Sequence, residues 1–123
     1  MARILMLAAL GAVLASPAWA AGDAARGAAA FRTECGTCHT VVQGGPNKVG
    51  PNLWGVFGST AGQRPGFRYS PGMQRSGLTW DEATLLRYMK APRRAVPGGT
   101  MSFPGVDDEG EAADIAAFLA TQR

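Results

Sequence analysis

The sequence predicts a small all-α domain in which three main helices and long loops surround a large apolar group. Three segments repeat apolar residues with the period of an amphipathic helix, and the chain of 123 residues has the usual length of one domain. The 17 glycines and 8 prolines lie mostly between those segments. The formal charge of +3 is small for a protein that binds DNA by neutralising phosphates, so nucleic acid is not expected as a partner.

Residues 1–20 are predicted to be a signal peptide that is cleaved from the mature domain, residues 21–123. Arg3 gives a short basic start, an uncharged apolar stretch follows, and Ala-Trp-Ala at 18–20 has the small-x-small form of a cleavage site. The alternative is a short buried or anchoring helix. The apolar stretch is shorter than the roughly 18 residues of a membrane span, which favours export without a membrane-spanning segment. The expected location is the bacterial periplasm, which oxidises thiols.

The first helix is expected to run from about Ala24 toward Thr37. The side chain of Asp23 can accept a hydrogen bond from a free N–H of the first turn. Gly27 and Phe31 are four residues apart and share one face of the helix. Because glycine weakens a helix, Gly27 indicates close approach by another element.

The other two helices begin at capping patterns. Thr79 and Glu82 form a capping box that opens the second helix, and Pro92 limits its end. Asp108 and Glu111 start the last helix. The apolar faces consist of Leu85, Tyr88 and Met89 on the second helix and of Ala112, Ile115, Phe118 and Leu119 on the last.

Between Val41 and Gly77 the sequence is dense in glycine and proline and shows no sustained period. Structureless segments of this length are uncommon in compact domains. Helix packing alone would leave this segment without an interior. A large apolar prosthetic group would supply the interior that the loops lack.

The motif Cys35-Gly36-Thr37-Cys38-His39 predicts the nature of that group, because C-x-x-C-H is the attachment sequence of c-type haem. Two cysteines three apart on a helical turn can reach the two vinyl groups along one haem edge, where each thiol forms a thioether. His39 then lies beneath the iron and presents a ring nitrogen as an axial ligand. The sequence thus predicts one covalently attached haem c.

Other functions of a Cys-x-x-Cys pair fit the sequence less well. A thioredoxin-like redox pair needs a βαβ context, which the pattern lacks. A structural zinc site usually has four Cys or His ligands, and this chain has two cysteines and one histidine. A disulfide between Cys35 and Cys38 suits an oxidising compartment but leaves the loops without an interior.

The second axial ligand is expected to be a methionine, because His39 is the only histidine. Met89 lies on an amphipathic helix, where core packing is the default for a flexible apolar side chain. Met73 lies in a glycine-rich stretch and stays open as a candidate. Met101 follows Pro-Gly-Gly-Thr at 97–100, which can turn tightly and bring backbone close to a flat ring. Met101 is therefore the preferred metal ligand.

Taken together, these motifs resemble class I cytochromes c, the family that includes mitochondrial cytochrome c and bacterial cytochrome c2. The resemblance covers about Gly22 to Gln122 and implies the small cytochrome c fold. The motifs that carry it, besides the cysteine motif, are Gly50-Pro51-Asn52-Leu53, Pro65-Gly66-Phe67-Arg68-Tyr69, Leu78-Thr79-Trp80 and the Pro97 to Met101 loop.

The resemblance implies supporting contacts for both axial ligands. The carbonyl of Pro51 would accept a hydrogen bond from the other ring nitrogen of His39 and fix the orientation of the ring. Tyr88 would lie beside the sulfur of Met101. His39 and Met101 would themselves bind the iron.

The resemblance also places aromatic residues around the haem. Tyr69 and Trp80 would donate to a haem propionate, and Phe103 would flank the exposed haem edge. Each of these side chains could also simply fill core. The first and last helices would cross at Gly27.

The chain departs from the mitochondrial members at three positions. They have a threonine two residues before the methionine, where this chain has Gly99, with Thr100 one residue later. Ser59 stands where they have an arginine that helps bury a propionate, and Met73 stands where they have an asparagine of an internal water network. These changes are expected to alter propionate burial and the reduction potential.

The ring of basic residues that the family carries around the haem edge is thinned. Arg93, Arg94 and Lys48 keep part of it, whereas acidic residues occupy 107–109, beyond Phe103. Acidic residues also suit the start of a helix. The sequence therefore favours a docking face of mixed charge, with weaker electrostatic steering of partners.

A coordination sphere closed by His39 and Met101 leaves no site for oxygen or peroxide. The chain is therefore expected to be a soluble one-electron carrier, not an enzyme, whose iron cycles between ferric and ferrous states. It would act as a monomer and dock transiently with redox-partner proteins at the haem edge. Two alternatives stay open: a dedicated electron-accepting subunit of a periplasmic dehydrogenase, and a haem enzyme or gas binder with an open sixth position.

Overall fold

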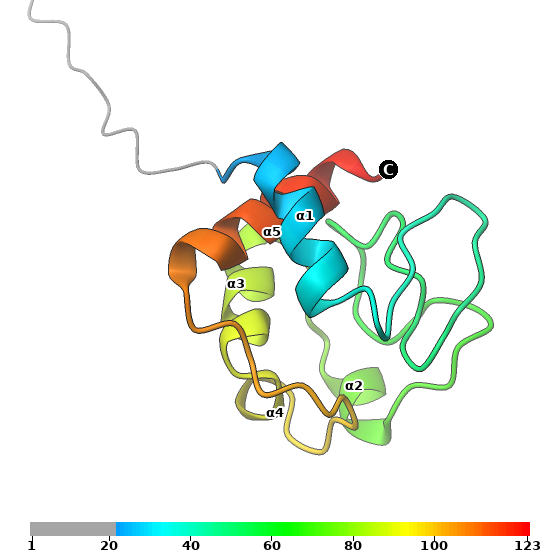
Figure 1. Ribbon diagram of the computed structural model, residues 1–123. Coiled ribbons are helices and arrows are strands. Elements are labelled where there is room, and N and C mark those ends of the chain that lie inside the picture. Colours follow the sequence, from blue (N-terminus) through cyan, green and yellow to red (C-terminus); the bar gives the residue numbers. More distant parts are fainter. Residues whose placement is uncertain (1–21) are drawn as a thin grey trace, which may run out of the picture.

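Five helices joined by loops make up the part of the chain that the computed structural model describes, residues 22–123 (Figure 1). They are α1 (Ala24–Glu34), α2 (Pro71–Arg75), α3 (Glu82–Lys90), α4 (Pro92–Ala95) and α5 (Glu109–Thr121). Within these residues the β-pairing is limited to an isolated bridge between Thr60 and Thr79. The predicted all-α fold with three main helices is confirmed. The predicted signal peptide, residues 1–20, lies outside the described residues.

The terminal helices α1 and α5 cross in close contact (Figure 1). Asp23 caps α1 by accepting a hydrogen bond of 2.9 Å from a first-turn amide. At the crossing, a Cβ on Gly27 would overlap the carbonyl oxygen of Asp114, so the backbones approach as closely as only glycine allows. Phe31 and Phe118 pack with their ring centroids 5.5 Å apart. The crossing predicted at Gly27 is therefore confirmed.

The cap of α3 differs from the one that the sequence predicts. Thr79 lies in the isolated bridge, and the side chain of Asp81 accepts the capping hydrogen bond from the Thr84 amide at 2.8 Å. The prediction of Thr79 as the cap is wrong, because pairing with Thr60 holds its backbone while Asp81 stands directly before the first turn. α3 ends at Lys90, ahead of Pro92, as predicted.

The sequence did not predict the two short helices, α2 and α4. Each begins with a proline in its first turn, where the missing N–H has no helical partner to lose. Ser70 caps α2 by accepting a hydrogen bond from the Met73 amide at 3.1 Å. With 5 and 4 residues, respectively, neither helix is long enough to show an apolar period. Pro92 consequently both limits α3 and starts α4.

The helices build one hydrophobic core, and the loop segment 41–70 lies beside it (Figure 1). Backbone hydrogen bonds tie this loop to the segment before α3, from Gly58 N to Trp80 O at 2.8 Å and from Ala61 N to Leu78 O at 2.8 Å. The core residues are Phe31, Ala61, Trp80, Leu85, Met89, Val106, Ala112, Ile115, Ala116 and Leu119. Loop and helices together enclose the cavity described next.

Candidate functional site

One cavity, with a volume of about 310 Å³, gathers every residue to which the sequence assigned a role at the site. They are Cys35, Cys38, His39, Pro51, Tyr69, Trp80, Tyr88, Met101 and Phe103. The walls come from the end of α1, the loop segment 49–73, α3, the 100–103 segment and α5. Residues far apart in the chain therefore converge on one space, which core residues such as Leu85 and Ile115 close from the helical side.

The two cysteines lie where α1 gives way to a turn. α1 ends at Glu34, three residues before the predicted end near Thr37, but the turn continues it, because the amide of His39 donates to the Cys35 carbonyl at 2.9 Å. Cys35 and Cys38 are both partly buried and not joined by a disulfide. Burial, reinforced by the charge of Glu34, raises the pKa of the Cys35 thiol to about 12. A thiol with so high a pKa lacks the thiolate character of a catalytic redox pair.

His39 is held in one orientation by its surroundings. Its Nδ1 donates to the carbonyl of Pro51 at 2.8 Å, the contact that the resemblance implies. A carbonyl only accepts, so Nδ1 carries the proton and Nε2 keeps a free lone pair. Burial lowers the pKa of the imidazole, which keeps the ring neutral. A Cβ on Gly50 would overlap the ring, so glycine is needed beside it. A neutral, oriented imidazole is the form that binds a metal.

Met101 lies beside Tyr88, as the resemblance implies. The Tyr88 hydroxyl donates to the Met101 sulfur at 3.8 Å. Burial raises the pKa of the Tyr88 phenol, so the hydroxyl stays protonated and able to donate. Met73 and Met89 also line the cavity. Met89 is buried in the core, whereas Met101 is the methionine whose sulfur has a hydrogen-bond donor.

Aromatic side chains form much of the cavity wall. The rings of Trp80 and Tyr88 meet edge to face with centroids 4.9 Å apart, and those of Phe67 and Tyr69 do the same at 4.9 Å. Burial raises the pKa of Tyr69, so its phenol is also a donor at neutral pH. The sequence did not single out Phe67 as a wall residue. Such walls suit a flat apolar ligand.

Two polar residues of the cavity were missed by sequence reasoning. Asn52 is 7% exposed, and its side chain joins two parts of the loop. It accepts a hydrogen bond from Val42 N at 3.1 Å and donates one to Val42 O at 2.7 Å. Arg64 lines the cavity and donates to the Asn52 carbonyl at 2.6 Å. Asn52 lies in a motif already recognised, but its role is visible only in the folded loop. Arg64 belongs to no pattern that would mark it for a role in the sequence.

The residues of the cavity fit a haem c and do not fit a bare metal ion. Within residues 22–123 there is no cluster of three or more His, Cys, Asp or Glu side chains that could hold a metal. The donors are instead one neutral imidazole and thioether sulfurs, set in apolar walls beside two thiols. Imidazole and thioether are axial ligands of haem iron, and the thiols are the groups that attach a haem covalently.

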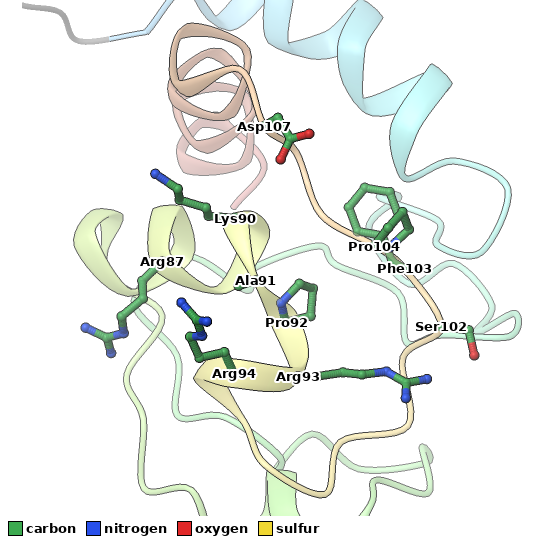
Figure 2. A pocket seen from close by; sticks show the side chains of 10 residues that line it. All are labelled: Arg87, Lys90, Ala91, Pro92, Arg93, Arg94, Ser102, Phe103, Pro104 and Asp107. Atoms are coloured by element: carbon green, nitrogen blue, oxygen red, sulfur yellow. The ribbon is translucent and has the colours of Figure 1, made fainter.

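A second and larger hollow, of about 810 Å³, is a groove on the surface (Figure 2). Its basic side chains come from α3 and α4, and its other side is formed by the segment 102–107. Figure 2 shows Arg93 extending toward the segment that carries Ser102. Phe103 lines both the groove and the cavity, so the two adjoin at that residue. The groove holds none of the cysteine, histidine or methionine donors, so the chemistry lies in the smaller cavity.

Comparison with known proteins agrees with this site. The family model described as Cytochrome c matches residues 24–123. The chain is 46% identical over 122 residues to cytochrome c2 of Rhodomicrobium vannielii, covering 98% of this chain and 97% of that protein. It is 43% identical over 99 residues to cytochrome c of Chlamydomonas reinhardtii, covering 80% and 88%. Among solved structures, cytochrome cH from Methylobacterium extorquens matches with a TM-score of 0.76 and 44% identity, covering 81% of this chain and 99% of that one.

Proposed function

This chain belongs to the cytochrome c family, and we propose that it shuttles single electrons between redox partners of the periplasm with His39 and Met101 as its axial ligands. It is an electron carrier with one covalently bound haem c. The haem supplies an iron that alternates between the ferric and ferrous states and so accepts or releases one electron. The protein provides attachment, ligands and a site that excludes other chemistry.

Cys35 and Cys38 are the attachment points in this proposal. Each thiol would add across one vinyl C=C bond of the haem, the sulfur bonding to one carbon and the hydrogen going to the other, so that the attachment would consume no oxidant. Both side chains line the same cavity as the two candidate ligands.

His39 and Met101 are the ligands that the geometry supports best. Pro51 holds the proton of His39 on Nδ1 and leaves Nε2 free for a metal. Tyr88 donates to the Met101 sulfur and so helps to hold the thioether in place. If His39 and Met101 both bind the iron, the chain would leave no position open for oxygen or peroxide, which supports an electron carrier over an enzyme.

The observation that carries the proposal is the convergence of Cys35, Cys38, His39 and Met101 on one cavity. Replacing Met101 by leucine tests it. In the oxidised variant we expect the weak long-wavelength band from sulfur-to-iron ligation to disappear. Met73→Leu, which changes another methionine of the same cavity, is the matched control and should keep the band. A band that persists in Met101→Leu, or is lost in Met73→Leu, would contradict the ligand assignment.

The proposed location rests on residues 1–20, which have the basic, apolar and small-x-small pattern of a signal peptide. Cleavage after Ala20 would leave residues 21–123 as the mature domain. No helix within residues 22–123 is both long and apolar enough to cross a membrane.

The proposed docking face is the haem edge at Phe103 together with the adjoining groove (Figure 2). Arg87, Lys90, Arg93 and Arg94 line the groove, and Asp107 adds one opposite charge. A basic groove with an acidic rim favours brief, salt-sensitive contact with acidic patches of partner proteins. Such contacts suit a monomeric shuttle that must leave its partner quickly.

A further inference from the structure

We propose that the guanidinium of Arg64 holds a propionate carboxylate of the bound haem and thereby helps to set the reduction potential. The proposal rests on the haem occupying the cavity as described above. It assigns to Arg64 a direct contact with the haem, which the sequence did not indicate.

The charge of the cavity wall points to Arg64. Of the residues that line the cavity, Arg64 is the only arginine or lysine, and Glu34 is the only acid. Haem is apolar apart from its two carboxylates, which are costly to desolvate without a cation or donors. In the largely apolar wall, the guanidinium of Arg64 is therefore the one positively charged group that could bind a carboxylate.

Arg64 is fixed in that position by the loop. Its Nη1 donates to the Asn52 carbonyl at 2.6 Å. Asn52 is itself pinned through its side chain, which donates to the carbonyls of Val42 at 2.7 Å and Gly45 at 3.1 Å. A guanidinium has five N–H donors in a rigid fork, so one bond to a carbonyl leaves the others available.

The remaining donors of Arg64 have no acidic partner among residues 22–123. The three salt bridges in this part of the chain involve Arg26 and Lys90 as their cations. Arg64 is partly buried, and a partly buried guanidinium favours a carboxylate with which it can form two parallel hydrogen bonds. Tyr69 lines the same cavity and has a protonated phenol, which adds a neutral donor.

Ser59 cannot take this role, although it stands where related proteins have an arginine. Its hydroxyl donates to the Val56 carbonyl at 2.6 Å, so its proton is already used by the backbone. Arg64 approaches the cavity from a different point of the same loop. The loss of an arginine at position 59 is thus offset by a cation five residues further on.

The test compares Arg64→Gln with Arg68→Gln, which removes the same charge from an exposed position of the same loop that does not line the cavity. The readouts are the propionate bands in redox-induced infrared difference spectra, assigned by isotope labelling of the haem carboxyl carbons, and the midpoint potential. In Arg64→Gln we expect the propionate bands to shift and the equilibrium to move toward ferric haem by about tenfold, because a positive charge near the iron is lost. Arg68→Gln should leave the bands unchanged and move the potential less.

Propionate bands in Arg64→Gln that match those of Arg68→Gln would overturn the proposal, whatever the potential does. If Arg64→Gln fails to fold with haem, Arg64→Lys provides the test. Lysine keeps the positive charge but lacks the planar set of N–H donors of the guanidinium. The propionate bands should therefore shift, while the midpoint potential stays near that of the parent protein. Unchanged bands in Arg64→Lys would contradict the contact. The sulfur-to-iron band serves as the separate check on His39 and Met101, so failure of this proposal leaves the ligand assignment standing.

Discussion

Single residues decide how the two candidate ligands face the cavity. The neutral imidazole of His39 owes its tautomer to the Pro51 carbonyl and its freedom from steric conflict to Gly50. Met101 lies in a loop, and the Tyr88 hydroxyl is the contact that orients its sulfur. The sequence could single out both residues as ligand candidates because their motifs are local. It could not predict Arg64, because the place of this residue depends on how the loop returns to Asn52.

A second residue-scale feature is the carboxylate of Asp114, which ties the start of α1 to α5. It accepts from Arg26 Nε at 3.0 Å and from the Asp23 amide at 2.6 Å. The hydrogen bond from Arg26, and then that from the Asp23 backbone, lower the pKa of Asp114 below its ordinary value of 3.8. A carboxyl group whose pKa is lower in the folded protein than in the unfolded chain stabilises the fold at pH values above its unfolded pKa. That stabilisation is lost as the pH falls through the lowered pKa of the folded protein.

Asp114→Asn should therefore reduce stability at neutral pH and flatten the loss of stability below about pH 4. The free energy of unfolding, measured by denaturant titration from acid to neutral pH, checks this. Asp107→Asn makes the same change of charge at the surface groove and serves as the control. If the free energy of unfolding of Asp114→Asn fell with decreasing pH as steeply as that of the parent protein, the contact would not contribute to stability.

At the scale of elements, the crossing of α1 and α5 fixes the end of α1, from which the cysteine motif continues. Gly27 lies on α1 and lets the two backbones approach. The same crossing buries Phe31, which is 3% exposed, and Ile115, which is 0% exposed, in one core. Ile115 also lines the cavity, so the packing of the two terminal helices supports the site directly.

Gly27→Ala should destabilise the protein, although alanine favours a helix by about 1 kcal/mol over glycine. The added methyl would overlap the Asp114 carbonyl, which is backbone and cannot swing away. Overpacking of this kind costs about 1–3 kcal/mol, so we expect a lower denaturant midpoint. Gly110→Ala is the matched control on α5, since its Cβ would meet only a side-chain oxygen of Asp108 at 3.1 Å. Equal or greater stability of Gly27→Ala would refute the close crossing.

The elements also show where sequence reasoning stops. α1, α3 and α5 were predictable because each is long enough to show caps and an apolar face. α2 and α4 are one turn or little more, so no period exists to detect. The cap of α3 was misassigned because two capping residues, Thr79 and Asp81, stand close together, and only the tertiary pairing of Thr79 decides between them.

At the scale of the whole molecule, the loops enclose the cavity, and core residues of the helices close its other side. The segment 41–77 contains only one short helix and is held by backbone hydrogen bonds to the segment before α3. The absence of an apolar period in this segment is the observation from which the sequence predicts an interior supplied by a bound group. The resulting account is that a haem joined to Cys35 and Cys38 serves as the interior for these loops.

The most direct test of that account is haem staining and mass measurement of the mature protein after complete denaturation. We predict a single haem that migrates with the chain and adds its whole mass to the polypeptide, and its loss when Cys35 and Cys38 are both replaced by alanine. A native protein that is folded but colourless, or whose haem separates from the chain on denaturation, would contradict the account.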